Sequence, residues 1–402
     1  MATKNILIIG TGDLRNYGCE AIVHGTHAIL QQALSNYQLY IASDNKDYDA
    51  TCLPPDIHLI NYKQRFTFHR IWRGILRRFF HSGNGSPVLM NRSIGKKFDL
   101  VLSCGGDNYC ESPGGTLSDI LTDLMAIGEN TVNHHRKFAL WGASVGPFSR
   151  TNESRIIENL QKSSLLCVRE PLSYHYLKQF HFGEKLQLVA DPAFMMPPDT
   201  SLRLNKKNHS VYIGINISRL SIGHTIKGNK EQQDFTNRLF VHLDYLLHHH
   251  PDWQFVCIPH VVIPDDTAQN DYLFMQQFLS MTSHKKQVSI LPPDIGAKAT
   301  KGYISQLDLL VAARMHCCVA GISTAVPTLF VTYSNKGIGM AQYAYGHHDF
   351  DMPVASLLSP DFESLVIRMV NNREQIKEGL QARQIQFTQD AMKAGEYLRT
   401  IL

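Results

Sequence analysis

Short runs of aliphatic, β-branched and aromatic residues recur along this 402-residue chain, and segments with helical periodicity separate them. Nearly every residue within a run is apolar, so the runs lack the alternation of a strand with one side in water. Strands of this kind are typical of parallel sheets covered by helices on both faces. The sequence therefore predicts an α/β architecture. The predicted strands are Asn5–Ile9, Gln38–Ala42, Ile57–Ile60, Asp99–Cys104, Lys137–Gly142, Leu165–Val168, Leu186–Val189, Val211–Ile217, Trp253–Ile258, Val288–Leu291, Leu307–Val311 and Thr328–Thr332.

A proline-rich and polar stretch divides this series of strands. Met196-Pro197-Pro198-Asp199 is followed by the polar segment Ser201–Ser210, which has the composition of a linker. We expect two Rossmann-like, doubly wound domains, residues 1–198 and 199–402, that face a cleft. The terminal helical pattern, Pro360–Leu402, could pack on the second domain or cross back to the first. Ligands of such folds bind outside the carboxyl ends of the strands, so polar residues just after strands are the candidates for function.

The net charge of +4 conceals one basic segment, residues 63–97, which carries nine Lys and Arg residues and no acidic one. Because the rest of the chain is mildly acidic, a protein that coats nucleic acid is disfavoured. Within this segment, Phe66–Phe80 combines a helical apolar stripe with arginines on its other faces. This pattern predicts binding to an anionic membrane surface, with an ordinary packed helix as the alternative. Without a predicted signal peptide or spanning segment, we expect a cytoplasmic protein that rests on the inner face of the membrane.

The first strand ends in an unusual turn that contains Asp13, Asn16 and Glu20. The turn lacks the third glycine of a dinucleotide fingerprint, because Arg15 stands at that position, so NAD binding is rejected. Contact with a substrate and simple turn and capping chemistry both fit the three polar residues. The run His248–His250 closes a helix, where consecutive side chains point in different directions, so we expect no metal site there.

Three later strands of the first half also end in residues suited to a ligand. Gly105-Gly106-Asp107 follows the fourth strand, and glycines there let backbone amides approach an anion or a sugar. Ser144 lies in the small-residue loop after the fifth strand. Arg169 closes the sixth, and a buried arginine needs an anion, which is either a protein carboxylate such as Glu170 or a ligand's. The sequence leaves both readings of Arg169 open.

In the second half, Arg314-Met315-His316 joins a strand to a small apolar helix. Amides, helix dipole and guanidinium all favour a phosphate at such a junction. Lys336 follows the next strand and is another candidate cation, and His260 ends an earlier strand on the same predicted side.

Taken together, these landmarks resemble the polysaccharide pyruvyl transferase family. The matching segments run in order along nearly the whole chain and exclude the basic segment. They are the Gly-Asp…Asn-Tyr-Gly-Cys-Glu turn, Cys-Gly-Gly-Asp at 104–107, Trp-Gly-Ala-Ser-Val-Gly-Pro-Phe at 141–148, Val-Arg-Glu-Pro-Leu-Ser at 168–173, Ala-Asp-Pro-Ala-Phe at 190–194, Gly-Ile-Asn-Ile-Ser at 214–218, Ala-Arg-Met-His at 313–316 and Pro…Tyr-Ser-Asn-Lys at 327–336.

The resemblance implies a GT-B-like pair of domains and the transfer of pyruvyl from phosphoenolpyruvate onto two hydroxyls of one sugar, which gives a cyclic ketal and phosphate. It implies that Arg169, Arg314 and His316 hold the donor and act in catalysis. Two arginines from opposite domains suit the carboxylate and phosphate of this donor, and a histidine suits the proton transfers. Family members often have Leu where Met315 stands.

We therefore expect a transferase that needs neither a metal nor a cofactor and acts on a saccharide, which could be lipid-linked. The alternatives are a GT-B glycosyltransferase that uses a nucleotide sugar and a saccharide-binding relative without turnover. The expected donor-binding residues are Arg169, Arg314, Met315, His316, Lys336 and Ser144. The expected acceptor-binding residues are Asp13, Asn16, Glu20, Asp107 and His260.

Overall fold

The computed structural model of the chain describes residues 3–61, 90–111 and 115–402. The chain forms two compact units, which do not coincide with a simple division into halves. Unit 1 contains residues 1–14, 26–191 and 390–402, and unit 2 contains residues 15–25 and 192–389. The predicted membrane-binding helix, Phe66–Phe80, lies outside the described residues.

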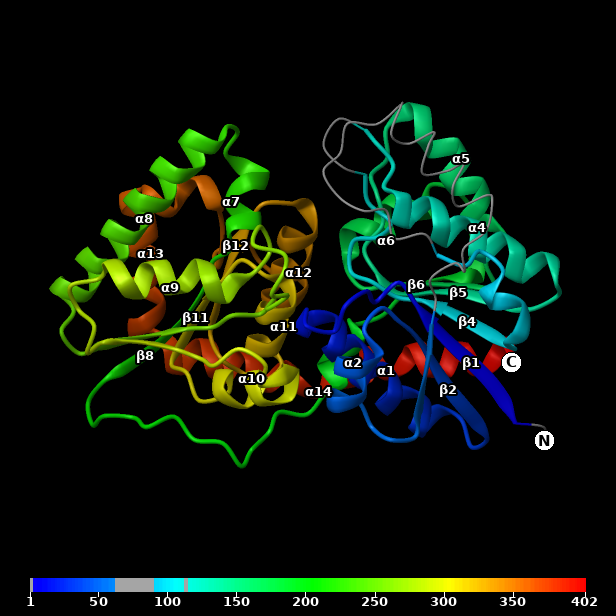
Figure 1. Ribbon diagram of the computed structural model, residues 1–402, viewed down its shortest axis with the longest axis horizontal. Coiled ribbons are helices and arrows are strands. Elements are labelled where there is room, and N and C mark those ends of the chain that lie inside the picture. The colour runs from blue at the N-terminus through cyan, green and yellow to red at the C-terminus, as the bar shows by residue number, and fades with distance from the viewer. Residues whose placement is uncertain (1–2, 62–89, 112–114) are drawn as a thin grey trace. The chain divides into compact units, whose positions relative to one another are not determined.

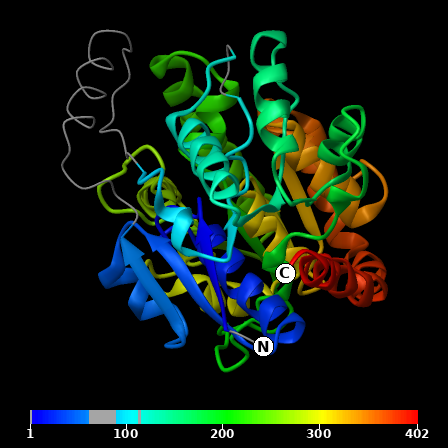
Figure 2. The ribbon, with the colours of Figure 1, turned by 90° about the vertical axis from the view of Figure 1, so that its right-hand side faces the viewer.

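Unit 1 is built on a seven-stranded parallel sheet with the order β3-β2-β1-β4-β5-β6-β7. Helices α4, α5 and α6 lie on one face of this sheet, and α1 and α2 lie on the other (Figure 1). The neighbouring strands β1 and β2 lie side by side (Figure 2). The strands are β1 (Lys4–Ile9), β2 (Tyr37–Ser43), β3 (Ile57–Asn61), β4 (Leu100–Ser103), β5 (Lys137–Ala143), β6 (Leu165–Val168) and β7 (Leu186–Leu188). The α-helices are α1 (Tyr17–Ala33), α2 (Lys46–Cys52), α4 (Asp119–Asn133), α5 (Arg150–Gln161) and α6 (Pro171–Lys178).

Unit 2 repeats this arrangement with a six-stranded parallel sheet of order β10-β9-β8-β11-β12-β13. Its strands are β8 (Val211–Asn216), β9 (Trp253–Cys257), β10 (Val288–Ile290), β11 (Leu309–Ala312), β12 (Thr328–Thr332) and β13 (Asp351–Pro353). Its α-helices are α7 (Arg219–Thr225), α8 (Asn229–His249), α9 (Asp271–Met281), α10 (Gly296–Ile304), α11 (Met315–Ile322), α12 (Asn335–Tyr345), α13 (Pro360–Asn371) and α14 (Arg373–Ile401).

The doubly wound prediction is confirmed, because each sheet reverses its strand order at one point. The reversal falls between β1 and β4 in unit 1 and between β8 and β11 in unit 2. Crevices at the carboxyl edge of such a switch point are where doubly wound folds bind ligands. Each of the predicted strands corresponds to a strand of the structure. Among the strands of the described residues, the sequence missed only β13, which is three residues long and ends in a proline.

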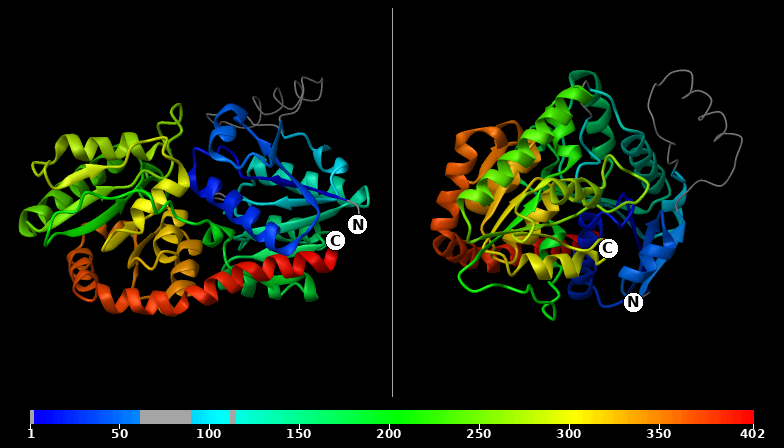
Figure 3. Two further views of the ribbon diagram at one scale, coloured as in Figure 1. Left: turned by 90° about the horizontal axis from the view of Figure 1, so that it is seen from below. Right: turned by 60° about the vertical axis from the view of Figure 1, so that its left-hand side comes forward.

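Two helices contribute residues to both units. The first part of α1 belongs to unit 2, and its Tyr17 and Ala21 are buried in the apolar core of that unit. The helix α14, unbroken in Figure 3, ends in unit 1, where Gly395 lies so close to Ile29 and Ala33 that a Cβ would meet them at 2.9 and 2.8 Å. The prediction left open whether this helix would cross back, and its last residues belong to unit 1. No helix of the described ranges is long and apolar enough to cross a membrane.

Candidate functional site

The start of α1 is a structural part of unit 2, although the strand before it belongs to unit 1. Asn16 forms an antiparallel bridge with Val261 in the loop after β9. The Tyr17 amide donates to the His260 carbonyl at 3.0 Å, and the Val262 amide donates to the Arg15 carbonyl at 3.0 Å. These bonds join segments about 245 residues apart. The polar turn found in the sequence therefore lies against the loop that carries His260.

Arg314 lies between β11 and α11 and has a buried protein carboxylate as its partner. Its Nη2 donates to Oδ1 of Asp271 at 2.8 Å, and its Nε lies 3.3 Å from both carboxylate oxygens. Nη2 also donates to the carbonyl of Gln269 at 2.9 Å. Arg314 is 8% exposed and Asp271 is 1% exposed. The ion pair therefore fixes the plane of the guanidinium at the carboxyl end of β11.

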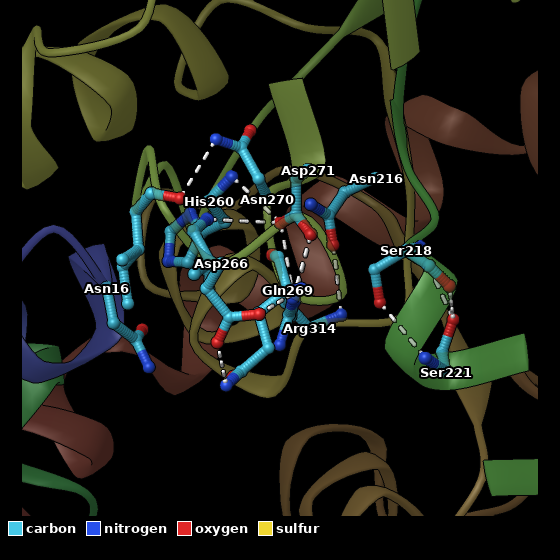
Figure 4. Close-up of polar contacts among 12 residues, drawn as sticks. Asn16, Asn216, Ser218, Ser221, His260, Asp266, Gln269, Asn270, Asp271 and Arg314 are labelled. Carbon is cyan, nitrogen blue, oxygen red and sulfur yellow. Dashed lines mark hydrogen bonds and ion pairs between the residues drawn. The ribbon is translucent and has the colours of Figure 1, made fainter. Parts of the chain in front are cut away.

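The same Asp271 carboxylate holds the loop that carries His260. The backbone amides of His260 and Val261 both donate to Oδ2 of Asp271 at 3.1 Å. Figure 4 shows this carboxylate between the loop and the Arg314 guanidinium. The buried side chain of Asn216, at the end of β8, makes two further hydrogen bonds. Its Nδ2 donates to the Ile258 carbonyl at 2.8 Å, and its Oδ1 accepts from the Arg314 backbone amide at 2.9 Å. The carboxyl ends of β8, β9 and β11 are thereby joined at the switch point of unit 2.

His260 is a buried histidine whose ring nitrogens have no hydrogen-bond partner among the described residues. The residue as a whole is 4% exposed, and its ring packs edge-on against the ring of Tyr17, with 5.9 Å between the two centroids. Burial, followed by the positive charges of His316 and Arg314, lowers the pKa of His260 to about 3. The imidazole is therefore neutral at physiological pH.

His316 is the second residue of α11 and is half-buried. Its ring packs directly against the backbone of Gly18, where a Cβ would overlap Nδ1 and lie 2.7 Å from Cγ. Only glycine allows α1 to begin this close to the histidine. His260, Arg314 and His316 therefore face one region at the start of α11.

Glu20 is 2% exposed, and its side-chain carboxylate contacts two other parts of the protein. Its Oε2 accepts from the Ala297 amide at 2.9 Å, near the N-terminus of α10, and its Oε1 lies 3.6 Å from Nε2 of His24. An acidic side chain at a helix N-terminus is stabilising. The structure therefore gives Glu20 a helix-capping contact within unit 2.

Arg169 is held inside unit 1 by three protein partners. Its Nη1 donates to Oδ2 of Asp191 at 2.6 Å, its Nε to Oγ of Ser144 at 3.0 Å and its Nη2 to the Gly106 carbonyl at 2.7 Å. Arg169 is 1% exposed and Asp191 is fully buried. The protein carboxylate that the sequence allowed is therefore present, but it is Asp191 and not the adjacent Glu170. Glu170 instead accepts from the Ser173 amide at 3.1 Å as the N-cap of α6.

The arrangement in unit 2 combines a fixed guanidinium, the N-terminus of an eight-residue helix and two histidines in different environments. A guanidinium and a helix N-terminus together attract an anionic group. A half-exposed imidazole can carry a proton, whereas the buried one can only donate or accept a hydrogen bond. The geometry suits binding of a small anion and proton transfer to or from it.

The sequence pattern of the polysaccharide pyruvyl transferase family matches residues 16–335, which is most of the chain. The chain belongs to the polysaccharide pyruvyl transferase family. Comparison with curated proteins gives no significant match.

Solved structures of other proteins resemble this pyruvyl transferase family member in fold. The UDP-GlcNAc 2-epimerase from Neisseria meningitidis, bound to UDP-GlcNAc, superposes with a TM-score of 0.59 at 12% identity and covers 98% of each chain. A protein from Listeria monocytogenes that is described as a UDP-N-acetylglucosamine 2-epimerase gives a TM-score of 0.58 at 11% identity. The match covers 98% of this chain and 94% of the other. These neighbours have the GT-B fold, so the predicted fold class is confirmed.

The residues predicted from the sequence fall into both units of this family member. Unit 2 contains Asn16, Glu20, His260, Arg314, Met315 and His316. Lys336 is the second residue of α12 in the same unit. Its Nζ lies 5.9 Å from the Tyr333 ring centroid, and it lines a small cavity with Met315. Unit 1 contains Asp13, Asp107, Ser144 and Arg169. Asn16 and Glu20 were expected on the first domain, but the pairing of the α1 start with the loop after β9 makes them part of unit 2.

Sequence reasoning missed Asp271 and Asn216, which organise the candidate site in unit 2. Asp271 looks like an ordinary helix start, because Asn270 caps α9 directly before it. Asn216 had a visible signal, since an asparagine that ends a buried strand needs a polar partner. Neither residue's partners could be identified from the sequence, because they belong to other loops and strands, 10 to 98 residues away.

Proposed function

We propose that this protein transfers pyruvyl from phosphoenolpyruvate onto two hydroxyls of one sugar in a polysaccharide or its precursor. Membership of the pyruvyl transferase family supports the general reaction. The observation that carries the choice of donor is the grouping of Arg314 and His316 at the start of α11, over the switch point of unit 2. Phosphoenolpyruvate carries a phosphate and a carboxylate, and a fixed guanidinium beside helix amides suits either group.

The proton balance of this reaction explains the histidine. The methylene carbon of the donor gains one proton and becomes a methyl group, while both sugar hydroxyls lose theirs. One of these two protons thus ends on carbon and the other on the departing phosphate. Both carbon–oxygen bonds of the ketal form at the central carbon, whose bond to the phosphate oxygen breaks. We assign His316 to carry protons in this exchange, because it lies beside Arg314 and is accessible.

The remaining site residues keep their predicted roles as proposals. On the donor side these are Arg169, Ser144, Met315 and Lys336, and on the acceptor side Asp13, Asn16, Glu20 and Asp107. The contacts within unit 1 support a positioning role for Arg169, since three protein partners hold its guanidinium. The contact of Glu20 with α10 likewise supports a role in holding the α1 start. No metal or cofactor enters the proposed reaction.

The proposed reaction is tested by phosphate release from phosphoenolpyruvate. We expect release only when an acceptor saccharide is present, across a panel of nucleotide sugars, lipid-linked saccharides and polymers. The product should gain the mass of one pyruvic acid less one water. Transfer of a sugar from a nucleotide donor without ketal formation would instead assign a glycosyltransferase, and binding of saccharides without either reaction would assign a non-catalytic relative.

We also propose, from the sequence alone, that Phe66–Phe80 brings the enzyme to the anionic inner face of the membrane, where lipid-linked acceptors are presented. Each Lys or Arg near such a surface adds about 1 kcal/mol of attraction. Vesicles that contain anionic lipid should therefore co-sediment with the wild type at low salt, and much less with a variant that has Arg73, Arg77 and Arg78 changed to Glu. Equal binding of both proteins would contradict the proposal.

A further inference from the structure

The side chain of His260 is buried and polar, and neither of its two ring nitrogens makes a hydrogen bond to a described residue. Both ring nitrogens are inaccessible to solvent and unpartnered among the described residues. A neutral imidazole carries one donor and one acceptor, so two groups are left unsatisfied. Buried polar groups in folded proteins are nearly always paired, and an exception needs an explanation. A bound ligand that supplies the missing partners is such an explanation.

The position of the ring is determined by its backbone. The His260 amide donates to Asp271 at 3.1 Å, and the His260 carbonyl accepts from the Tyr17 amide at 3.0 Å. The Tyr17 ring then packs edge-on against the imidazole. The orphaned nitrogens are therefore not the result of a loosely attached loop. The fold therefore holds two unpaired ring nitrogens in a buried environment, which lowers the stability of the protein when no ligand pairs with them.

The neighbours of His260 indicate which part of the reaction it serves. The Asp271 carboxylate that holds its backbone also binds the guanidinium of Arg314. Burial lowers the pKa of the imidazole most and keeps it neutral, and the positive charges of His316 and Arg314 act in the same direction. These are the residues to which the proposed function assigns the donor. His260 therefore lies with the donor-binding residues, whereas the sequence suggested contact with the acceptor.

We propose that the neutral imidazole of His260 donates a hydrogen bond to an anionic oxygen of the donor, on its phosphate or its carboxylate. This inference rests on the proposed function. A neutral ring that is difficult to protonate polarises an anionic oxygen without exchanging its proton with solvent. In a buried site such a bond is stronger than in water. His260 thus complements His316, which carries protons, by binding the donor without changing its own charge.

Replacing His260 by phenylalanine separates this role from a structural one. His260→Phe keeps an aromatic ring against Tyr17 and removes both orphaned nitrogens, so the ligand-free protein should be as stable to heat as the wild type or more stable. Affinity for inorganic phosphate, measured by calorimetry, or for phosphoenolpyruvate should fall about 10- to 100-fold, the loss expected for one hydrogen bond to a charged group. Pyruvate serves as the carboxylate probe, so the ligand whose affinity falls identifies the group contacted.

Two further variants make this test independent of packing. His260→Gln retains a neutral donor and should recover most of the lost affinity. His242→Phe is the matched control, since His242 lies on α8 in the same unit with its Nδ1 3.1 Å from the Leu357 carbonyl. It should leave the affinity for each probe unchanged.

The outcomes distinguish this inference from the proposed function. If the wild type turns over phosphoenolpyruvate and His260→Phe does so with unchanged KM and kcat, the inference is overturned and the function stands. If the wild type binds phosphate without turnover and His260→Phe loses that binding, the anion contact stands and the proposed reaction fails. A less stable His260→Phe protein with unchanged affinity for all three probes would make the ring structural and would overturn the inference.

Discussion

Replacing His316 by alanine is expected to lower kcat for phosphoenolpyruvate-dependent phosphate release by about 10²–10⁴, the range for loss of a general acid–base group. The apparent affinity for the donor should change much less, because Arg314 and the N-terminus of α11 remain. Since Gly18 packs against the histidine ring, the alanine variant leaves space where the imidazole was. Steady-state kinetics with varied donor, at a saturating concentration of acceptor, measure both constants.

Added imidazole provides the control for His316→Ala, because a free base that enters the vacated space should restore part of the lost kcat. His316→Gln, which fills the space without a titratable group, should stay inactive in the presence of imidazole. A His316→Ala enzyme with kcat within threefold of the wild type would reduce His316 to a packing partner of Gly18. The proton carrier would then have to be sought among other residues.

The sequence predicted the two sheets of this protein well because their strands are buried on both faces. A strand such as Leu100–Ser103 is fully buried, and its unbroken apolar run is visible without any knowledge of its neighbours. The edge strand Asp351–Pro353 has only one buried residue, so no comparable run marks it. The assignment of the α1 start to unit 2 was also invisible, because it depends on pairing with a loop far along the chain.

The candidate site shows the same division between local and long-range information. The rule that ligands bind after parallel strands selected Arg169, Arg314 and His260 as candidates, and in the structure each of them follows the carboxyl end of a strand. Their acidic partners were not found, because ion pairing between Arg314 and Asp271 depends on how β11 and α9 are brought together. Asp191 was within reach of sequence reasoning. It follows β7, the strand paired with the one that Arg169 closes, so both residues leave the same edge of the sheet.

Removing the Asp271 carboxylate is expected to destabilise the protein more than the substitutions of His260 and His316 do. Asp271→Ala leaves the Arg314 guanidinium buried without its counter-ion, which typically costs about 3–5 kcal/mol. It also removes the acceptor for the His260 and Val261 amides. For a unit of this size we expect the melting temperature of unit 2 to fall by about 6–20 °C. Differential scanning calorimetry measures the change.

The exposed pair of Arg238 and Asp234 on α8 gives the matched control, since its two charges lie 3.9 Å apart in solvent. Asp234→Ala should change the free energy of unfolding by less than about 0.5 kcal/mol, because surface pairs contribute little. A similar loss of stability in Asp271→Ala and Asp234→Ala would contradict the assignment of Asp271 as the organising residue.

The double variant Asp271→Ala, Arg314→Met tests whether the cost comes from the unpaired charge itself. Once the guanidinium is replaced by an apolar side chain, no buried charge remains, so the double variant should be more stable than Asp271→Ala alone. Donor binding should nevertheless be lost in the double variant, because it lacks the Arg314 cation. From Asp271→Ala to the double variant, the stability measured by calorimetry should therefore rise while the affinity for phosphate falls, with the wild type as the reference for both. A double variant that is no more stable than Asp271→Ala would instead mean that Asp271 acts through the His260 loop and not through Arg314.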